Sequence, residues 1–177
     1  MEGVKAALQS GADVNTKDKF GMTGLMWAIQ YPHGNSVVAL LLNTPNIDVN
    51  LKSEMGFCAL YFAVRNSEGL KLLLNVSNID VNIVDNEGLN AVHHAADQYT
   101  NKGLKLLLSH PSLTTLTLNQ KEKLDGDTPL MLAMRRRDQV EHVEVLVADP
   151  RVDLDTTDKE GKSLEEVAIA SGKYHCW

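Results

Sequence analysis

A stretch of eight residues occurs five times along the chain, and this repetition constrains the fold more than any other feature. Every copy begins with a glycine and ends with an alanine; the copies are Gly21–Ala28, Gly56–Ala63, Gly88–Ala95, Gly126–Ala133 and Gly161–Ala168. The glycines of successive copies lie 32 to 38 residues apart. Self-similarity at a period near this length is typical of solenoids, in which each unit packs only against its neighbours. The sequence therefore predicts a stack of similar units.

The fourth copy shows most clearly how a helix begins in each unit. The hydroxyl of Thr128 is placed to accept hydrogen bonds from the amides of the first helical turn. Pro129 suits the first position of a helix, because the N–H that it lacks would have no partner there. Apolar runs follow the first four copies and predict a second helix. In the first complete unit, Leu25, Trp27 and Ala28 are expected to form the packing face of the first helix.

The repeated stretches resemble the ankyrin repeat, and the resemblance covers essentially the whole chain. It implies one all-α domain over residues 1–177, an ankyrin-repeat solenoid of helix-turn-helix units with protruding β-turn or hairpin loops. Because the sequence begins and ends within a repeat, we expect either a segment of a longer array or a small protein with half-repeat caps. Partial units are expected at residues 1–16 and 158–177, and complete units at residues 18–50, 53–82, 85–118 and 123–155.

The link between Ser109 and Leu124 is longer than the other links between units. Threonine and leucine alternate over Thr114–Leu118, which is compatible with a short extended hairpin. An irregular surface loop is the second interpretation, because loops absorb insertions at a small cost in free energy. Both alternatives stay open at this point.

The charge and composition of the chain argue against several classes of function. Lysine and arginine number 17 against 23 aspartates and glutamates, so the formal net charge is −6, whereas nucleic-acid binding needs a basic face. Cys58 and Cys176 are isolated and match neither a disulfide framework nor a zinc site, which favours a reducing, intracellular compartment, cytoplasmic or nuclear. No apolar run reaches the roughly 18 residues of a membrane span, and the N-terminus lacks a signal-peptide pattern.

The candidate catalytic and metal-binding residues all have a structural interpretation. His93 and His94 are adjacent on a predicted helix, where side chains point about 100° apart, so they cannot readily bind one metal ion. The resemblance implies that His93 ties neighbouring loops together, and His94 falls at a packing position. Cys58 takes the capping position that threonine holds in other copies, so we interpret it as a weak cap rather than a nucleophile. Aspartates three residues before a repeated glycine are interpreted as turn formers that bond their own backbone: Asp18, Asp85 and Asp158.

The resemblance implies a concave protein-binding surface made by the turns and the exposed ends of the first helices. Aromatic residues and methionine are enriched in interface cores, so the apolar turn residues are expected to form one ridge for a protein partner. The alternative is that these side chains pack against adjacent turns. Arg135, Arg136 and Arg137 end a first helix, which fits either a solvated helix end or a contact with an acidic partner. The predicted partner-binding residues are Phe20, Met22, Tyr31, Met55, Phe57, Arg65, Leu89, Arg135 and Arg136.

Asn50 and Asn82 are candidate sites of covalent modification. Each ends an Asp-Val-Asn sequence and has a leucine eight residues earlier. This pattern is similar to the one by which the oxygen-sensing asparaginyl hydroxylase takes ankyrin repeats as substrates. We therefore expect hydroxylation at these two asparagines.

The sequence as a whole favours non-catalytic protein–protein interaction, as an adaptor, a scaffold or a targeting module. The alternative is a regulatory segment of a larger enzyme or channel whose catalytic part lies outside this chain. An autonomous enzyme is disfavoured, because the sequence has no P-loop, no dinucleotide fingerprint and no Gly-x-Ser-x-Gly motif. We expect no metal, no cofactor, no small-molecule substrate, no nucleic acid and no insertion into a membrane.

Overall fold

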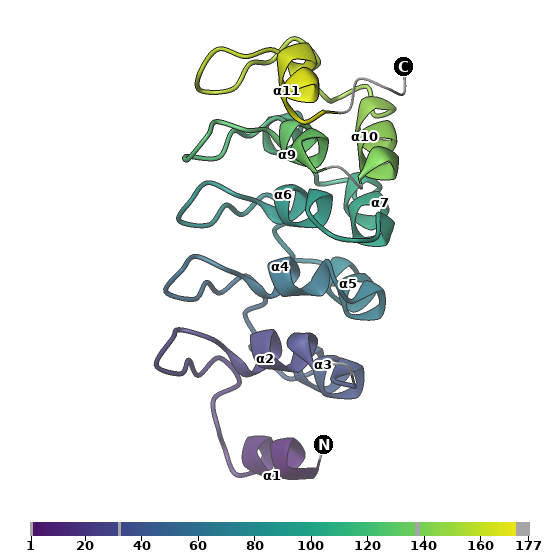
Figure 1. Ribbon diagram of the computed structural model, residues 1–177. Helices are drawn as coiled ribbons and strands as arrows, with labels where there is room; N and C mark the ends of the chain where they lie inside the picture. Colours follow the sequence, from purple (N-terminus) through teal and green to yellow (C-terminus); the bar gives the residue numbers. More distant parts are fainter. Residues whose placement is uncertain (1, 32, 137–138, 173–177) are drawn as a thin grey trace.

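The computed structural model describes residues 2–31, 33–136 and 139–172, and these ranges form a stack of helix pairs (Figure 1). One layer contains the first helix of each unit: α2 (Gly24–Gln30), α4 (Ala59–Ala63), α6 (Ala91–Ala96), α9 (Pro129–Arg135) and α11 (Leu164–Ala170). The second layer contains α1 (Glu2–Gln9), α3 (Asn35–Leu42), α5 (Ser67–Leu74), α7 (Lys102–Leu108) and α10 (Val140–Val147). Turns project from the stack on one side, and isolated antiparallel bridges close three of them. The predicted all-α solenoid with protruding turns is confirmed.

The capping residues begin the helices as their hydrogen-bonding chemistry predicts. The hydroxyl of Thr23 accepts a bond from the amide of Met26 at 3.3 Å, and Thr128 does the same for Met131 at 3.4 Å. Asn90 and Ser163 form complete capping boxes with the third residue of their helices. Cys58 holds the same position without a side-chain hydrogen bond, so its role as a cap is weak, as expected.

The core lies between the two layers and continues from unit to unit. The alanine that ends each of the first four motif copies is buried, and its small side chain allows the neighbouring helices to approach closely. In α2, however, Leu25, Met26 and Ile29 are almost fully buried, whereas Trp27 is 39% exposed. The prediction that Trp27 packs in the core is therefore wrong. Its indole Nε1 instead donates a hydrogen bond to a carboxylate oxygen of Asp18 at 2.9 Å.

The turn aspartates bond their own backbone, which confirms the interpretation of Asp18, Asp85 and Asp158. Oδ1 of Asp85 accepts hydrogen bonds from the amides of Glu87 and Leu89, both at 2.9 Å. The other two aspartates make the same pair of bonds. In the fourth complete unit Glu122 replaces the aspartate, and its longer side chain accepts bonds from three amides of a larger turn.

Four asparagines join each unit to the next: Asn15, Asn50, Asn82 and Asn119. The amide nitrogen of Asn50 donates to the carbonyl of Asn78 at 2.7 Å, and its oxygen accepts from the amide of Asp80 at 2.9 Å. The other three make the equivalent pair of bonds, each to a backbone carbonyl and a backbone amide in the next link between units. These side chains therefore fix the spacing between neighbouring units.

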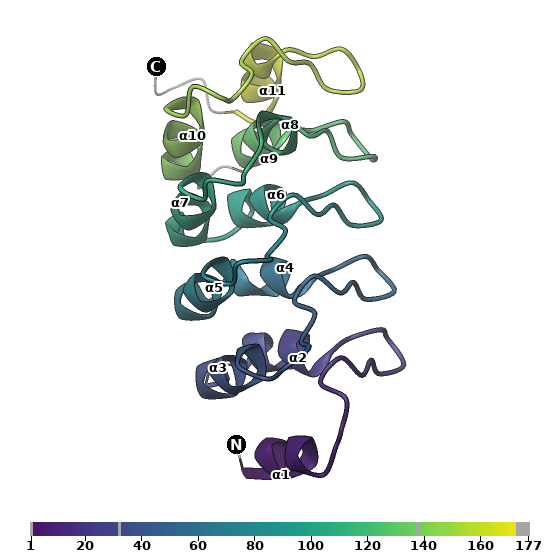
Figure 2. The same ribbon diagram turned by 180° about the vertical axis from the view of Figure 1, so that it is seen from behind.

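The long link contains a short helix, α8 (Thr115–Leu118), which appears beside α9 in Figure 2. The extended hairpin predicted from Thr114–Leu118 is therefore wrong, and the irregular loop is wrong only for the residues of α8. Thr114 caps the helix by accepting a bond from the amide of Thr117 at 3.1 Å, and Leu118 is buried beneath it. Alternating threonine and leucine thus supplies a cap and two buried side chains, Thr117 and Leu118, rather than a strand.

The two partial units have different ends. At α1, Gly11 has a φ of +91°, and the amides of Gly11 and Ala12 bond back to the carbonyls of Leu8 and Ala7. Gly11 is therefore a glycine C-cap of α1. At the other end, α11 stops at Ala170 and the described chain at Gly172, while Cys176 and the rest of residues 173–177 lie outside the described residues. None of the helices in the described ranges is long and apolar enough to cross a membrane.

Candidate functional site

The turns and the exposed sides of the first-layer helices form one surface, which we call the inner face. Backbone hydrogen bonds join the turns in register: the amide of Glu54 donates to the carbonyl of Phe20 at 3.1 Å, and that of Asn86 to Met55 at 3.3 Å. Equivalent bonds join the third turn to the fourth and the fourth to the fifth. Both views of the fold show the five turns stacked on the same side (Figures 1 and 2). The inner face is therefore a connected surface rather than a row of separate loops.

The apolar residues predicted on the turns divide into exposed and buried groups. Phe20 and Met55 are 55% and 59% exposed, on adjacent turns. Phe57 and Leu89 are half-buried, and Phe57 makes edge contacts with three neighbouring rings. Met22 is buried, so its prediction as an exposed partner-binding residue is wrong. The tight turn around Asp18 places the Met22 side chain against the core, and the proposed ridge is narrower than the sequence indicated.

The first-layer helices add three aromatic residues to the inner face, one of which, Trp27, was expected in the core. Trp27 of α2 is exposed, Phe62 of α4 is half-buried, and Tyr31 at the end of α2 is strongly exposed, as predicted. The sequence does contain a pattern that indicates the exposure of Trp27. Leu25, Ala28 and Ile29 have the i, i+3, i+4 spacing of one buried stripe, and Trp27 lies off that stripe.

A groove of about 650 Å³ lies where the first two complete units meet, at the ends of α2 and α4 and the start of α5. The predicted residues Tyr31 and Arg65 are both in its lining. Among the described residues, the lining consists of Ile29, Gln30, Tyr31, Phe62, Arg65, Asn66, Ser67 and Glu68. The apolar part of the inner face thus belongs mainly to the first two complete units.

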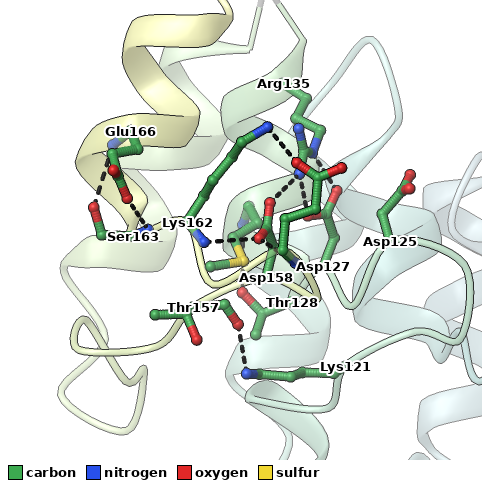
Figure 3. A network of polar contacts seen from close by, with 12 residues as sticks. Lys121, Asp125, Asp127, Thr128, Arg135, Thr157, Asp158, Lys162, Ser163 and Glu166 are labelled. Carbon is green, nitrogen blue, oxygen red and sulfur yellow. Dashed lines mark hydrogen bonds and ion pairs between the residues drawn. The ribbon is translucent and has the colours of Figure 1, made fainter.

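The charged residues gather at the other end of the inner face (Figure 3). The guanidinium of Arg135 donates to Asp127 of its own unit and to Asp158 of the next unit, with Nη2 distances of 2.9 Å to each. Both carboxylates are 2% exposed, against 33% for the arginine side chain. Burial raises the pKa of Asp158, but backbone amides and Arg135 lower it by more, so the pKa lies below its usual value. Arg135 therefore joins two units.

The sequence interpretation of the arginine run needs correction at Arg135. Its side chain is one third exposed, but its charge is not free for an acidic partner, because two buried carboxylates of the same chain hold it. Arg136 is exposed and forms an ion pair with Asp97 at 2.6 Å, between neighbouring units. Arg137 lies outside the described residues.

His93 and His94 have the structural roles that the sequence indicated. Nδ1 of His93 accepts from the amide of Asn90 at 3.2 Å, so Nε2 carries the proton and donates to the carbonyl of Asp127 at 3.2 Å. Burial lowers the pKa of His93 to about 4, which keeps the ring neutral at pH 7. His94 lies 3.3 Å from Asp85 and packs against the ring of Tyr61. Neither ring points freely into solvent.

The buried thiol of Cys58 is not poised as a nucleophile. Burial raises its pKa to about 11, so the reactive thiolate is scarce at neutral pH. Within the described ranges, histidine, cysteine, aspartate and glutamate side chains do not gather in a group of three that could hold a metal ion.

Comparisons with known proteins agree with this architecture. A family model described as "Ankyrin repeats (3 copies)" matches residues 1–85 and 66–160. The crystal structure of EF0377, an ankyrin repeat protein, is similar with a TM-score of 0.82 and 22% identity, over 97% of this chain and 86% of that one. A chain in the structure of the Bd0816 predatory endopeptidase from Bdellovibrio bacteriovorus, in complex with immunity protein Bd3460, is similar with a TM-score of 0.76 and 26% identity. That match covers 96% of this chain and 85% of the other.

Proposed function

Because the chain belongs to the ankyrin repeat family, we propose that it is a non-catalytic recognition module that binds a protein partner on its inner face. Ankyrin repeats are generally protein–protein interaction modules. The observation that carries the proposal is the exposure of Phe20, Trp27, Tyr31 and Met55 on the first two complete units. Exposed aromatic residues and methionine that lie on one connected face are typical of interface cores. The backbone bonds between turns support binding, since a surface held in register loses little entropy on contact.

The same proposal covers the kind of partner and the compartment. A net charge of −6 favours a protein over a nucleic acid as the partner. An adaptor, scaffold or targeting role in the cytoplasm or nucleus fits the free thiol of Cys58. A second candidate is a regulatory segment that acts on an enzyme. This candidate is supported by the similarity to a chain in the structure of an endopeptidase in complex with an immunity protein.

Replacing Phe20 and Met55 together by serine is expected to weaken partner binding at least about tenfold, because exposed aromatic anchors carry most of the energy of an interface. Partners captured from cell extract by the native chain would be identified by mass spectrometry and their affinities measured for both forms. Phe57 stays unchanged, since its ring packs against Tyr61 and Phe62.

The matched control replaces two exposed leucines by serine: Leu116 on α8 and Leu154 in the fourth complete unit. This control removes an apolar area comparable to that of Phe20 and Met55, but outside the turn tips, and it should leave the affinity for the partner unchanged. Unchanged circular dichroism would establish that each variant folds. Equal affinity of the native chain and the Phe20 and Met55 variant would refute the proposed role of the turns.

Hydroxylation of Asn50 and Asn82 stays a prediction, with a sharper test than the sequence alone allowed. Asn15 and Asn119 make the same bonds between units but have Ala7 and Pro111 eight residues earlier, where the candidates have leucine. After incubation with the asparaginyl hydroxylase, peptide mapping should find one added oxygen on each candidate and none on Asn15 or Asn119. The side-chain amide nitrogen and oxygen of each candidate asparagine are hydrogen-bonded to the backbone. The reaction is therefore expected to require local opening of the link. Absence of the added oxygen rejects the idea.

A further inference from the structure

The groove at the ends of α2 and α4 points to the chemistry of the partner. We propose that it binds a large apolar side chain of the partner protein, and that Arg65 pairs with a carboxylate next to that side chain. The proposal rests on the function proposed above and names the part of the partner that the first two complete units recognise.

The groove has apolar walls and a fixed polar edge. The half-buried Phe62 and the almost fully buried Ile29 line the groove, and Tyr31 adds an exposed ring at the rim. At the edge, the amide nitrogen of Asn66 donates to the side-chain oxygen of Asn35 at 2.8 Å, while its oxygen accepts from the amide of Gly69 at 3.0 Å. These bonds satisfy the Asn66 amide within the chain. Phe62 and Tyr31 keep exposed apolar surface in the groove, so its geometry favours an aromatic or large aliphatic occupant.

Arg65 differs from the other arginines of the described residues. Arg135, Arg136 and Arg151 each form an ion pair with an aspartate of the chain. Arg65 is exposed and forms no ion pair with the described residues. Glu68, the carboxylate that shares the groove, is already paired with Lys71 at 2.9 Å. Arg65 therefore leaves a guanidinium fork at the groove, and its geometry matches a carboxylate that it can bind with two hydrogen bonds.

Charge complementarity makes this recognition selective. The chain carries a net charge of −6, so acidic residues of a partner are disfavoured over the surface as a whole. A carboxylate is favoured only where a local cation outweighs that charge, and at the groove this cation is Arg65. The expected partner segment therefore carries an aspartate, a glutamate or a terminal carboxylate within one or two residues of its apolar anchor.

A phage library of random 12-residue peptides tests the proposal. Peptides selected on the native chain should be enriched in an acidic residue next to an aromatic or large aliphatic one. Selection on the Arg65→Glu variant should replace the acidic residue by lysine or arginine at the same distance from the anchor. Peptides chosen on the native chain should bind Arg65→Glu about tenfold more weakly, since an attraction is lost and a repulsion is added.

The control variant Lys5→Glu makes the same change of charge on α1, in the second layer, and should select the same acidic peptides as the native chain. Unfolding temperatures of both variants would be compared with the native chain to confirm that they fold. If selected peptides bind the inner face but show no acidic preference, or if Arg65→Glu keeps that preference, the inference is overturned. If the selected peptides bind both Arg65→Glu and the serine variant of Phe20 and Met55 as tightly as they bind the native chain, they do not bind the inner face, and the proposed function fails instead.

Discussion

Replacement of Gly56 by alanine is expected to lower the free energy of unfolding by about 3 kcal/mol, for two separate reasons. Gly56 has a φ of +81°, a conformation that costs an L-residue about 1–2 kcal/mol. An alanine Cβ would also lie 2.7 Å from the backbone nitrogen of Asn86 in the next turn. This second contact cannot relax cheaply, because the amide of Asn86 is bonded to Met55 in the ladder of turns.

Gly88 separates the two contributions, since its φ of +82° is the same while its surroundings differ. The nearest atom to a Cβ at Gly88 is the side-chain Cγ of Lys123 at 3.4 Å, an ordinary contact. Gly88→Ala should therefore cost only the conformational part, about 1–2 kcal/mol. Urea unfolding of both variants measures the difference. Equal losses for the two variants would mean that the close approach of adjacent turns contributes nothing.

Arg135→Ala is expected to lower the free energy of unfolding by about 2–3 kcal/mol, because it leaves two buried carboxylates without their cation. Asp127 and Asp158 belong to successive units, so the loss should fall on the junction between the fourth complete unit and α11. Protection of the α11 amides from hydrogen exchange should decrease more than that of α6. Thermal unfolding and hydrogen exchange together measure the size and the place of the effect.

The neighbouring variant Arg136→Ala is the matched control. Its ion pair with Asp97 is exposed on both sides, so its loss should cost less than about 1 kcal/mol. The two variants should also differ in acid. The folded-state pKa of Asp158 is depressed, so its contribution to stability is present above the usual pKa of 3.8 and is lost as the pH falls through the lower folded value. Arg135→Ala should weaken this dependence and Arg136→Ala should keep it; equal behaviour contradicts the assignment.

The helix caps, helix ends and turn bonds of the repeat could be predicted from the sequence, because each joins residues that lie only a few positions apart. Thr23 and Thr128 cap helices, Gly11 ends one, and the aspartates before the repeated glycines bond their own turns. His93 could be placed as well, since its role follows from its position in the repeat. The period of the motif then determined the order and the pairing of the helices.

The candidate site was predicted less well, because exposure depends on neighbours. Phe20, Tyr31 and Met55 are exposed as expected, but Met22, two residues from Phe20, is buried. Trp27 was assigned to the core because it is large and apolar, although the buried stripe of α2 passes through Leu25 and Ile29. Hydrophobicity alone does not say which side of a short helix meets the next unit.

The sequence by itself determined that this chain is a stack of capped helix pairs joined by glycine turns, because those signals are local and repeat with the period of the unit. Only the tertiary structure decided which residues also make close contacts or ion pairs with a neighbouring unit. A Cβ at Gly56 would lie 2.7 Å from the backbone of the next turn, whereas one at Gly88 would lie 3.5 Å from it; Arg135 holds carboxylates of two units, and Arg65 holds none among the described residues. These differences arise from contacts between residues about one repeat apart, and a pattern within a single repeat contains no information about such contacts.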